Sequence, residues 1–329
     1  MSKVLITGIT GFVGSALARA LAAEGAELFG LVRPSSDRSR LDGLPVTWME
    51  GDVTVRESLA GVFDWVDGVI HAAGMLGRAG VPESAYHQLH VNGTSNVLGE
   101  IEKLDNPPKV LYVSSPGVLG PINGPPADEN APPAPSNAYE RSKAAAEMVT
   151  QIFARQGTPV VITRPEFIYG PTDMHVLGLF QAIQKGRFFT IDHGRATCHP
   201  TYIDDAVDGM LRCLKQGRHG QVYHIAGPEP VTFRALADTI ATAVGVPPPT
   251  RNLPHWLAMA GATALEIGGA LFKTTPPLSR DGVAFFSDDR RFSWQKAHHE
   301  LGYTPRFSLT TGVVRTVAWY QEKGLLEKM

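Results

Sequence analysis

The stretch that decides the fold is Lys3-Val4-Leu5-Ile6-Thr7-Gly8-Ile9-Thr10-Gly11-Phe12-Val13-Gly14, close to the start of the chain. Its first half is a short apolar run, which is typical of a strand buried on both faces of a parallel sheet. Its second half has glycine at every third position and leads into a helical pattern over residues 15–21. Such glycines let the backbone approach a pyrophosphate, and the helix N-terminus directs N–H groups towards it. We therefore predict a nucleotide site lined by Gly8, Gly11, Phe12, Val13 and Gly14, with a purely structural tight turn as the alternative.

Further apolar segments along the chain predict the rest of a sheet. They lie at residues 27–32, 46–49, 68–71, 110–114 and 160–163, and helical patterns separate most of them. Alternation of this kind requires right-handed crossovers and produces a parallel sheet with helices on both faces. The sequence thus predicts an α/β fold with a doubly wound parallel sheet, of the Rossmann type.

The pattern changes after about residue 228, where proline clusters bracket helical, apolar segments. We interpret this part as a smaller, mainly helical substrate-binding region. The predicted division assigns residues 1–165 plus about 195–227 to the dinucleotide-binding domain. Residues from about 166 to 194 plus 228–329 form the substrate-binding region.

Composition excludes several classes of function. The chain has 329 residues, 30 basic and 32 acidic side chains and a formal net charge of -2, so it lacks the basic excess of a nucleic-acid-binding protein. Its two cysteines form no metal-binding pattern and indicate a reducing compartment. No signal peptide and no apolar run long enough to span a bilayer is evident. We expect a cytoplasmic protein without a metal site.

Residues after the second and third strands bear on the choice of cofactor. A dinucleotide site usually has an acidic residue about 20 residues after the glycines, which holds the ribose hydroxyls. Here Arg33 ends the second strand instead, and an arginine suits a 2′-phosphate. The sequence therefore favours NADP(H), with NAD(H) and a merely solvated Arg33 as alternatives. Asp52 and Val53 follow the third strand, where they would pack beside the adenine, although Asp52 would serve equally as a helix cap.

A tyrosine and a lysine provide candidate acid/base chemistry. Tyr139 and Lys143 are four residues apart, so on a helix they share one face. A nearby ammonium group favours phenolate, so we expect the pKa of Tyr139 to fall. Ser114 and Ser115 end a predicted strand, where parallel sheets place their ligands. The alternatives are an incidental surface pair and serines that only cap the strand.

Several motifs in a fixed order resemble a known family. Over about two thirds of its length the chain resembles the extended short-chain dehydrogenase/reductase family, which includes NAD-dependent epimerases and dehydratases. The matching stretches are TGITGFVG (7–14), GDVT (51–54), HAAG (71–74), YVSSPGVLG (112–120), YERSK (139–143), RPEFIYGP (164–171) and HPTYIDDAVDGM (199–210).

The resemblance implies a role for each matching residue. Ser115 rather than Ser114 is the catalytic hydroxyl, because it stands five residues before Gly120 as in the family pattern. Tyr139 is then the general acid/base, and Lys143 binds the nicotinamide ribose and tunes the tyrosine. The cofactor would also be lined by Ala72, Ala73 and Pro165.

Two positions depart from the family pattern. His90 occupies the place of a frequent asparagine, and it is interpreted either as a packed helical residue or as part of a relay. Glu166 stands where a small residue is common, and it either faces the pocket as a second proton donor or is solvated.

Two kinds of reaction remain open at this stage. The first is hydride transfer between nicotinamide and a carbonyl or secondary alcohol, as the resemblance to 3β-hydroxysteroid dehydrogenases and dihydroflavonol reductases implies. The second is that of a nucleotide-sugar epimerase or dehydratase, which recycles its cofactor within one turnover. No arginine-centred diphosphate clamp is evident, although Arg187, Arg195 and Arg251 could supply one. Retention of the serine, tyrosine and lysine argues against a regulator without catalysis.

An almost uncharged segment over residues 253–272 bears on substrate and partners. It fits an apolar, steroid- or flavonoid-like small molecule, or peripheral contact with a membrane surface. A helix packed in a core or in a dimer interface is the alternative. The helices preceding residues 110 and 160 often form a dimer face in this family, which makes a homodimer a second expectation.

Overall fold

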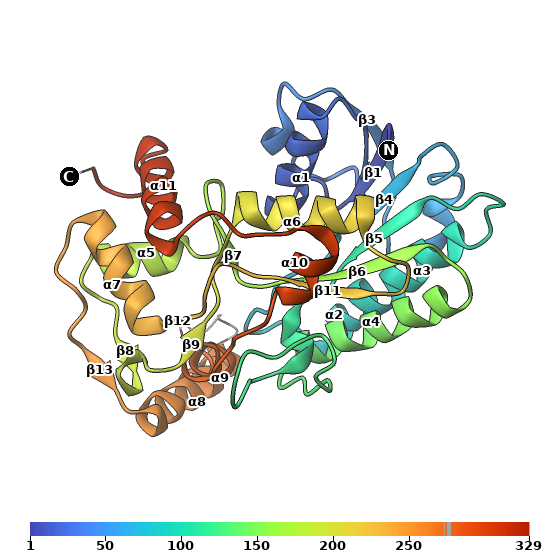
Figure 1. Cartoon of the computed structure of the whole chain (residues 1–329). Coiled ribbons are helices and arrows are strands. Elements are labelled where there is room, and N and C mark those ends of the chain that lie inside the picture. Colours follow the sequence, from blue (N-terminus) through green and yellow to red (C-terminus); the bar gives the residue numbers. More distant parts are fainter. Residues whose placement is uncertain (273, 275–277, 329) are drawn as a thin grey trace.

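A parallel sheet of seven strands forms the centre of the molecule (Figure 1). The computed structural model describes residues 1–272, 274 and 278–328, and its sheet has the strand order β11-β6-β5-β4-β1-β2-β3. The strands are β1 (Lys3–Thr7), β2 (Glu27–Val32), β3 (Val46–Glu50), β4 (Gly68–His71), β5 (Lys109–Val113), β6 (Val160–Pro165) and β11 (Val222–Ile225). The order reverses at β1, so the carboxyl ends of β1 and β4 flank the point where such sheets bind ligands. The predicted doubly wound fold is confirmed.

Helices cover both faces of this sheet because neighbouring residues of each strand point to opposite sides. Val4 and Ile6 of β1 pack in the core beneath one layer of helices, whereas Leu5 packs in the core beneath the other. The first layer holds α1 (Phe12–Ala23) and α6 (Ile203–Gln216). The second layer holds α2 (Glu83–Tyr86), a π-helical segment (His87–Asn92), α3 (Gly93–Ile101) and α4 (Ala138–Arg155).

The C-terminal half adds helices beside the carboxyl edge of the sheet, towards the left of Figure 1. They are α5 (Leu177–Gln184), α7 (Phe233–Val244), α8 (His255–Phe272), α9 (Arg280–Ser287) and α11 (Leu309–Glu322), whereas α10 (Gln295–Leu301) lies nearer the centre against α6 and β11. Three short pairs of strands join them: β7 (Ile168–Tyr169) with β10 (Thr201–Tyr202), β8 (Thr190–Ile191) with β13 (Asn252–Leu253), and β9 (Thr197–Cys198) with β12 (Val231–Thr232). Short 3₁₀ turns lie at Ser39–Leu41, Arg56–Leu59, Pro116–Leu119 and Asp192–Gly194.

The predicted domain boundary stays a prediction. In space, α10 packs on α6 and β11 of the central sheet, although residues after 228 were assigned to the substrate-binding region. Among the helices in the described parts of the chain, none is long and apolar enough to cross a bilayer. Within the same residues no three potential metal-ligating side chains come together.

Candidate active site

The glycine turn after β1 is shaped by close contact with the end of β4. Gly8 has a φ of 72°, and a side chain there would place its Cβ 2.7 Å from the carbonyl oxygen of Ala72. A Cβ at Gly14 would overlap the carbonyl oxygen of Gly8. The backbone N–H of Ala73 donates to Thr7 Oγ1 at 3.2 Å, which joins the two strand ends. The glycines therefore let the turn pack tightly, and the cradle of backbone N–H groups that it forms with the N-terminus of α1 is of the kind that fits a dinucleotide pyrophosphate.

His71 connects the elements beneath this cradle. Its role was not predicted from the sequence. Its Nδ1 lies 2.7 Å from Thr7 Oγ1, and its Nε2 lies 3.1 Å from Thr94 Oγ1. Burial, together with the nearby Lys143 ammonium, lowers the pKa of His71 to about 3. The ring is therefore neutral and serves as a bridge between β1, β4 and α3.

The predicted adenine side of the site lies beyond β2 and β3. Arg33 is exposed just after β2, and its backbone N–H donates to Ser36 Oγ. Of the cations nearby, Arg38 lies over the ring of Trp48 and Arg40 donates to the carbonyl of Thr172. Arg33 has no side-chain partner within the described chain, so it is the arginine that can turn to a ligand.

Asp52 and Val53 follow β3 and occupy different environments. One carboxylate oxygen of Asp52 accepts hydrogen bonds from the backbone N–H and the hydroxyl of Thr54, at 2.9 and 2.8 Å. Val53 is buried in the core, against Gly93. Asp52 thus closes a local turn rather than capping a helix, because the next 3₁₀ turn has Val55 at its N-cap.

The first two turns of α4 hold Tyr139 and Lys143 on one face. Asn137 caps the helix by accepting from the backbone N–H of Glu140 at 2.9 Å. Lys143 is buried, and its Nζ donates to the carbonyl of Val113 at 2.8 Å and lies 4.9 Å from the ring centre of Tyr112. Burial lowers the pKa of Lys143 to about 8.

The expected fall in the pKa of Tyr139 is wrong. Burial raises the pKa of Tyr139 to about 12; the Ser115 hydroxyl lowers it, whereas the charges of Glu166 and Glu140 raise it further. The rise due to burial therefore outweighs the fall expected from the spacing to Lys143. The phenol is thus protonated at neutral pH, which makes it a proton donor.

The two serines after β5 have different neighbours. Ser114 is buried and donates to Glu147 Oε2 at 2.6 Å, so its hydroxyl is already used. Ser115 accepts a hydrogen bond from the backbone N–H of Gly117 at 3.1 Å, and its hydroxyl lowers the pKa of Tyr139. The second serine is therefore the one that can share a ligand with the tyrosine.

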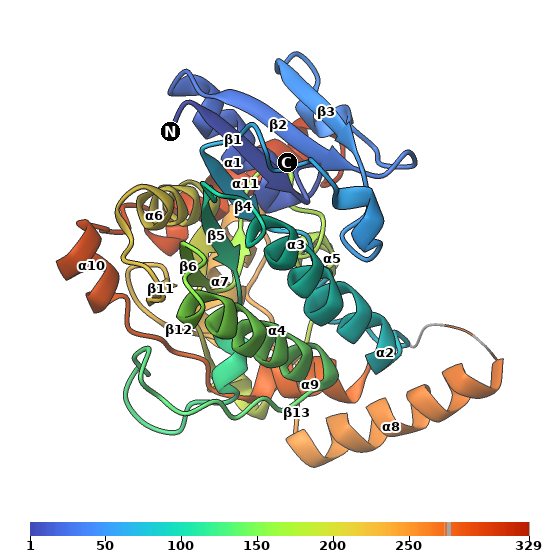
Figure 2. The ribbon, with the colours of Figure 1, turned by 90° about the vertical axis from the view of Figure 1, so that its right-hand side faces the viewer.

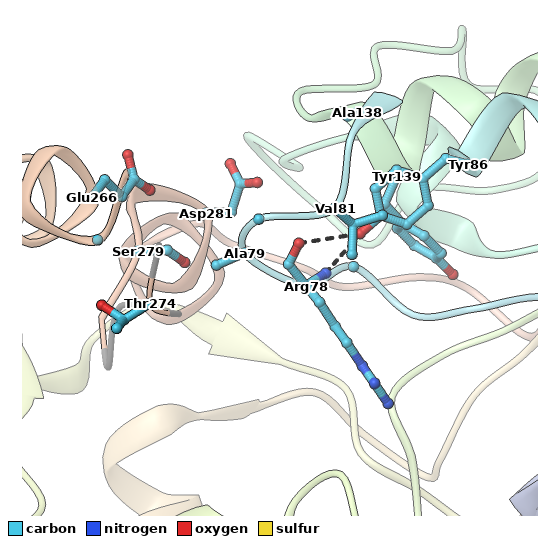
Figure 3. A pocket seen from close by; sticks show the side chains of 13 residues that line it. Arg78, Ala79, Val81, Tyr86, Ala138, Tyr139, Glu266, Thr274, Ser279 and Asp281 are labelled. Carbon is cyan, nitrogen blue, oxygen red and sulfur yellow. Dashed lines mark hydrogen bonds between the residues drawn. The ribbon is translucent and has the colours of Figure 1, made fainter. Parts of the chain in front are cut away.

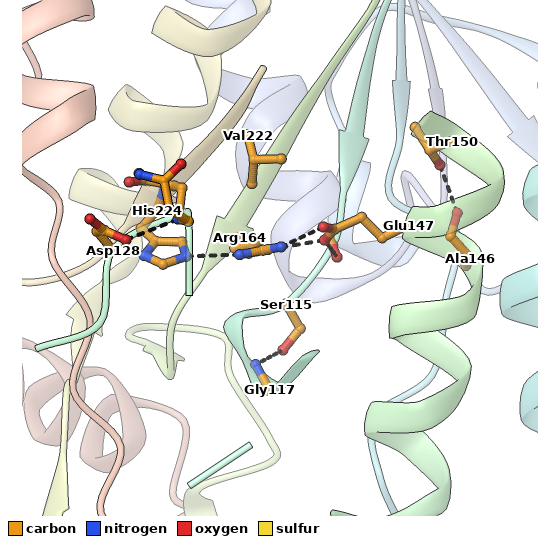
Figure 4. Close-up of polar contacts among 12 residues, drawn as sticks. Ser115, Gly117, Asp128, Ala146, Glu147, Thr150, Arg164, Val222 and His224 are labelled. Atoms are coloured by element: carbon orange, nitrogen blue, oxygen red, sulfur yellow. Dashed lines mark hydrogen bonds and ion pairs between the residues drawn. The ribbon is translucent and has the colours of Figure 1, made fainter. Parts of the chain in front are cut away.

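A buried ion pair between β6 and α4 holds the helix that carries Tyr139 and Lys143 (Figure 4). Arg164 of β6 donates to both oxygens of Glu147 on α4, at 2.5 and 3.0 Å, and both side chains are buried. Arg164 Nη1 also lies 3.2 Å from Nε2 of His224 on β11. This network fixes α4 against the carboxyl ends of two strands, so Tyr139 is presented by a rigid support.

His90 connects to the backbone of Tyr139 through a chain of hydrogen bonds. The backbone N–H of Met75 donates to His90 Nε2 at 3.1 Å, so the ring proton lies on Nδ1. Nδ1 then donates to Ser142 Oγ at 2.8 Å, and Ser142 donates to the carbonyl of Tyr139 at 2.7 Å. Burial lowers the pKa of His90 to about 3, so the neutral ring acts in this chain. His90 is therefore a packed residue linked to the backbone of Tyr139, and a catalytic or relay role for it stays a prediction.

Glu166 follows β6 and is only 7% exposed, so the alternative of a solvated side chain is wrong. Burial raises the pKa of Glu166 to about 7; Arg290 opposes this rise and Glu140 adds to it. The preceding Pro165 ends β6 at the same edge of the sheet as the glycine turn.

A cleft of about 490 Å³ opens beside Tyr139 (Figure 3). One wall is the loop over residues 77–81, which Tyr86 holds by accepting from the backbone N–H of Arg78 at 2.8 Å. The other wall comes from the end of α8 and the start of α9, where it includes Glu266, Gly269, Thr274, Ser279 and Asp281. The cleft therefore lies between Tyr139 and the C-terminal helices, and neither Ser115 nor Lys143 is among the described residues that line it.

The sequence profile of the NAD-dependent epimerase/dehydratase family matches residues 4–226. The chain belongs to this family. The resemblance to extended short-chain dehydrogenases/reductases is thereby confirmed, and the protein is a nicotinamide-dependent enzyme of that type.

Relatives within the family catalyse both kinds of reaction. The 4-hydroxy-2-methyl-3-oxo-4-farnesyl-3,4-dihydroquinoline-1-oxide ketoreductase of Stigmatella aurantiaca is 28% identical, over 94% of each chain. The decarboxylating sterol-4-alpha-carboxylate 3-dehydrogenase of Schizosaccharomyces pombe is also 28% identical, over 97% of each chain. Among solved structures, the dTDP-glucose 4,6-dehydratase DesIV of Streptomyces venezuelae, with NAD and TYD bound, is 26% identical over 99% of each chain with a TM-score of 0.81.

Proposed function

We propose that this enzyme transfers hydride between a nicotinamide cofactor and a carbonyl or secondary alcohol of an apolar substrate. The observation that carries the proposal is the position of Tyr139. Tyr139 lines the cleft with a protonated phenol whose pKa is lowered by the Ser115 hydroxyl, and Lys143 lies one helical turn behind it.

Each of these residues has a separate part in the chemistry. A bound nicotinamide supplies or accepts the hydride. Tyr139 gives its phenolic proton to the substrate oxygen in reduction and takes a proton back in oxidation. Ser115 hydrogen-bonds the same oxygen and thereby orients it. The ammonium group of Lys143 stabilises the phenolate that remains after proton transfer.

We propose NADP(H) as the preferred cofactor, with the side chain of Arg33 contacting the 2′-phosphate. Arg33 is exposed just after β2, which supports this proposal. The neighbouring Arg38 and Arg40 already contact Trp48 and the carbonyl of Thr172, respectively. The carboxylate of Asp52 already accepts hydrogen bonds from Thr54. We therefore place Asp52 beside the adenine and do not assign it to binding the ribose hydroxyls. NAD(H) is the alternative, because the DesIV structure contains NAD.

The proposal of an apolar substrate rests on the C-terminal helices. α8 carries Glu266 as its one formally charged side chain among the positions described, and its end lines the cleft. Two of the relatives are named for farnesyl and sterol substrates. The same helix leaves Trp256 and Ile267 exposed, which supports peripheral contact with a membrane surface.

An epimerase or dehydratase acting on nucleotide sugars is the second candidate, and the likeness to DesIV favours it. This reaction would need a cationic site for a diphosphate. Arg187, Arg195 and Arg251 are all exposed, and none of them is among the described residues that line the cleft. The geometry therefore supports the first candidate better.

Replacement of the acid/base residue tests the proposal. We expect Tyr139→Phe to lower kcat by about 10²–10⁴-fold because the proton donor is lost, while the Kd for NADPH stays within about twofold. NADPH oxidation at 340 nm with steroid, flavonoid and aliphatic ketones measures kcat, and NADPH fluorescence measures binding. Normal turnover in the variant would exclude Tyr139 as the acid. Conversion of a UDP- or GDP-sugar without net cofactor change would establish the second candidate instead.

A further inference from the structure

Three aromatic rings pack together beside the cleft. Tyr86 ends α2, and His90 follows in the π-helical segment, a kind of turn that is frequent at functional sites. The ring centres of Tyr86 and His90 lie 6.2 and 5.7 Å from that of Tyr139, and both rings meet it edge-on. Tyr86 is only 2% exposed, and it lines the cleft together with Tyr139. The ring of the proposed proton donor is therefore fixed by two packed rings.

The hydroxyl group of Tyr86 holds the backbone of the loop over residues 77–81, which is one wall of the cleft (Figure 3). It accepts from the N–H of Arg78 at 2.8 Å and donates to the carbonyl oxygen of the same residue at 3.3 Å. In the described parts of the chain, no other hydrogen bond joins residues 77–81 to another element. Gly77, Arg78 and Gly80 are exposed, so burial adds little to the fixing of this wall.

The same loop lies against the proton donor itself. A Cβ at Gly77 would be 3.4 Å from the Cβ of Tyr139, so the loop backbone rests on the base of that side chain. Just before the loop, the N–H of Met75 donates to His90 Nε2 at 3.1 Å. The side chains that pack on the ring of Tyr139 thus also hold the segment that forms the wall. A substrate that contacts this wall is thereby placed relative to the phenol.

We propose that Tyr86 is a positioning residue, which acts through Tyr139 and through the loop over residues 77–81. Its ring orients the phenol of Tyr139 towards the substrate oxygen, and its hydroxyl holds the loop as a wall for the substrate. The inference rests on the proposed function, because it takes Tyr139 as the proton donor. It adds that the hydroxyl of Tyr86 governs substrate binding, whereas its ring governs proton transfer.

Steady-state kinetics of two variants separate the hydroxyl from the ring. The probes are NADPH and the ketone that the unmodified protein reduces fastest among 1-tetralone and the steroid, flavonoid and aliphatic ketones named above. We expect Tyr86→Phe to raise the KM for this ketone about threefold to tenfold and to leave kcat within about twofold, because only the loop loses its hydrogen bonds. Tyr86→Leu should also lower kcat by about tenfold to a hundredfold, because the ring of Tyr139 loses a packed neighbour.

Hydrogen exchange tests the loop without turnover, and it keeps the test valid if Tyr86→Leu does not fold. The amide hydrogen of Arg78 should exchange at least about tenfold faster in Tyr86→Phe, since this N–H loses its acceptor. Mass spectrometry of peptides that cover residues 75–81 measures the rate. Tyr320→Phe is a matched control, because Tyr320 is a buried tyrosine of α11 whose hydroxyl donates to the carbonyl of Asp173. This variant should leave the KM, kcat and the exchange of residues 75–81 unchanged.

The outcomes distinguish a positioning role from a purely structural one. Unchanged KM and unchanged exchange in Tyr86→Phe would overturn the assignment, as would equal changes in Tyr320→Phe. An equal fall in kcat in Tyr86→Phe and Tyr86→Leu would overturn the division between hydroxyl and ring. Faster exchange in Tyr86→Phe, with no NADPH oxidation by the unmodified protein on any of the ketones, would instead uphold the contact of Tyr86 with the loop and overturn the oxidoreductase.

Discussion

At the scale of single residues, burial of Glu166 makes the stability of the protein depend on pH. Its folded pKa of about 7 lies above the ordinary 4.5, so the folded state binds this proton more tightly than the unfolded state. Stability from this group is therefore complete below about pH 4.5 and is lost as the pH rises through about 7. The loss reflects the cost of an ionised carboxylate that has little solvent around it.

Replacing Glu166 by glutamine should remove that loss. We expect Glu166→Gln to gain about 1–3 kcal/mol in free energy of unfolding relative to the unmodified protein at pH 8, and much less at pH 5. Urea unfolding at the two pH values measures the difference. Glu102→Gln is the control, since this exposed residue should give the same difference at both. An equal gain at pH 5 and pH 8 would show that Glu166 is not buried as described.

Arg33 supports a second prediction at the residue scale. Its exposed guanidinium group at the end of β2 would pair with a 2′-phosphate, whereas an aspartate there would repel the phosphate and accept from a free 2′-hydroxyl. Arg33→Asp should therefore shift the ratio of kcat/KM for NADPH over NADH by at least about tenfold towards NADH. Arg38→Asp provides the control, because Arg38 already lies over Trp48. An unchanged ratio in the Arg33 variant would exclude the assigned role.

The site shows which kinds of residue a sequence can assign. Gly8, Tyr139 and Lys143 belong to local patterns, so their roles can be proposed from spacing, whereas Ser115 was preferred to Ser114 only because of the family resemblance. The buried state of Glu166 could not be predicted, because it depends on Arg290 and on segments far away in the chain. The pKa of Tyr139 was mispredicted for the same reason. Spacing predicted that Lys143 lies one turn along the helix from Tyr139, but not the burial that raises the pKa of the tyrosine.

At the scale of elements, strands β1 to β6 could be predicted to within about one or two residues, because each is a short apolar run between turn-forming residues. β11 was not predicted, since Val222–Ile225 contains Tyr223 and His224 and lacks that apolar signal. Likewise, the residue types of the segment His87–Asn92 do not distinguish its π-helical form from an ordinary α-helix. The carboxyl edge of the sheet was predictable, whereas the elements that close the cleft over it were not.

α8 is the element whose sequence and surroundings agree least. It is apolar around its whole circumference, which is typical of a fully buried helix. Yet Ala258 and Ala262 are buried on one side, whereas Trp256 and Ile267 on the other are 70% and 60% exposed. Figure 2 shows the helix projecting from the body of the molecule. The alternative of a core helix is therefore wrong for this chain. The exposed apolar side of α8 would be covered only by a partner outside the described chain.

We expect that partner to be a membrane surface. The protein should cosediment with vesicles of phosphatidylcholine and phosphatidylglycerol, and Trp256→Glu with Ile267→Glu should weaken the partition coefficient at least about tenfold, since two large apolar side chains no longer enter the interface. Trp65→Glu is a matched control, because Trp65 is also 70% exposed but follows β3 on another part of the chain. Equal loss in the control, or no cosedimentation of the unmodified protein, would contradict the prediction.

At the scale of the whole molecule, α3 and α4 form the face at which we expect a second copy of the chain to bind. They lie side by side over one face of the sheet. On α4, Met148 and Ile152 are 62% and 51% exposed and stand one helical turn apart. Because both side chains point away from the core, pairing of this face with its own copy about a twofold axis would bury them.

We therefore expect a homodimer whose dissociation depends on these two residues. Met148→Asp with Ile152→Asp should raise the dimer Kd by at least about a hundredfold, since each change places a charge in an apolar contact. Sedimentation velocity over a range of protein concentrations measures the Kd. Val314→Asp on α11 is the control, because Val314 is exposed to the same degree as Ile152 but lies on the opposite half of the chain. All variants should retain their affinity for NADPH, because the glycine turn lies on β1 and α1, away from the substituted residues. A monomeric variant that still binds NADPH would show that the loss of the dimer is not caused by unfolding. A monomeric unmodified protein, or a dimer that survives both aspartates, would place the interface elsewhere.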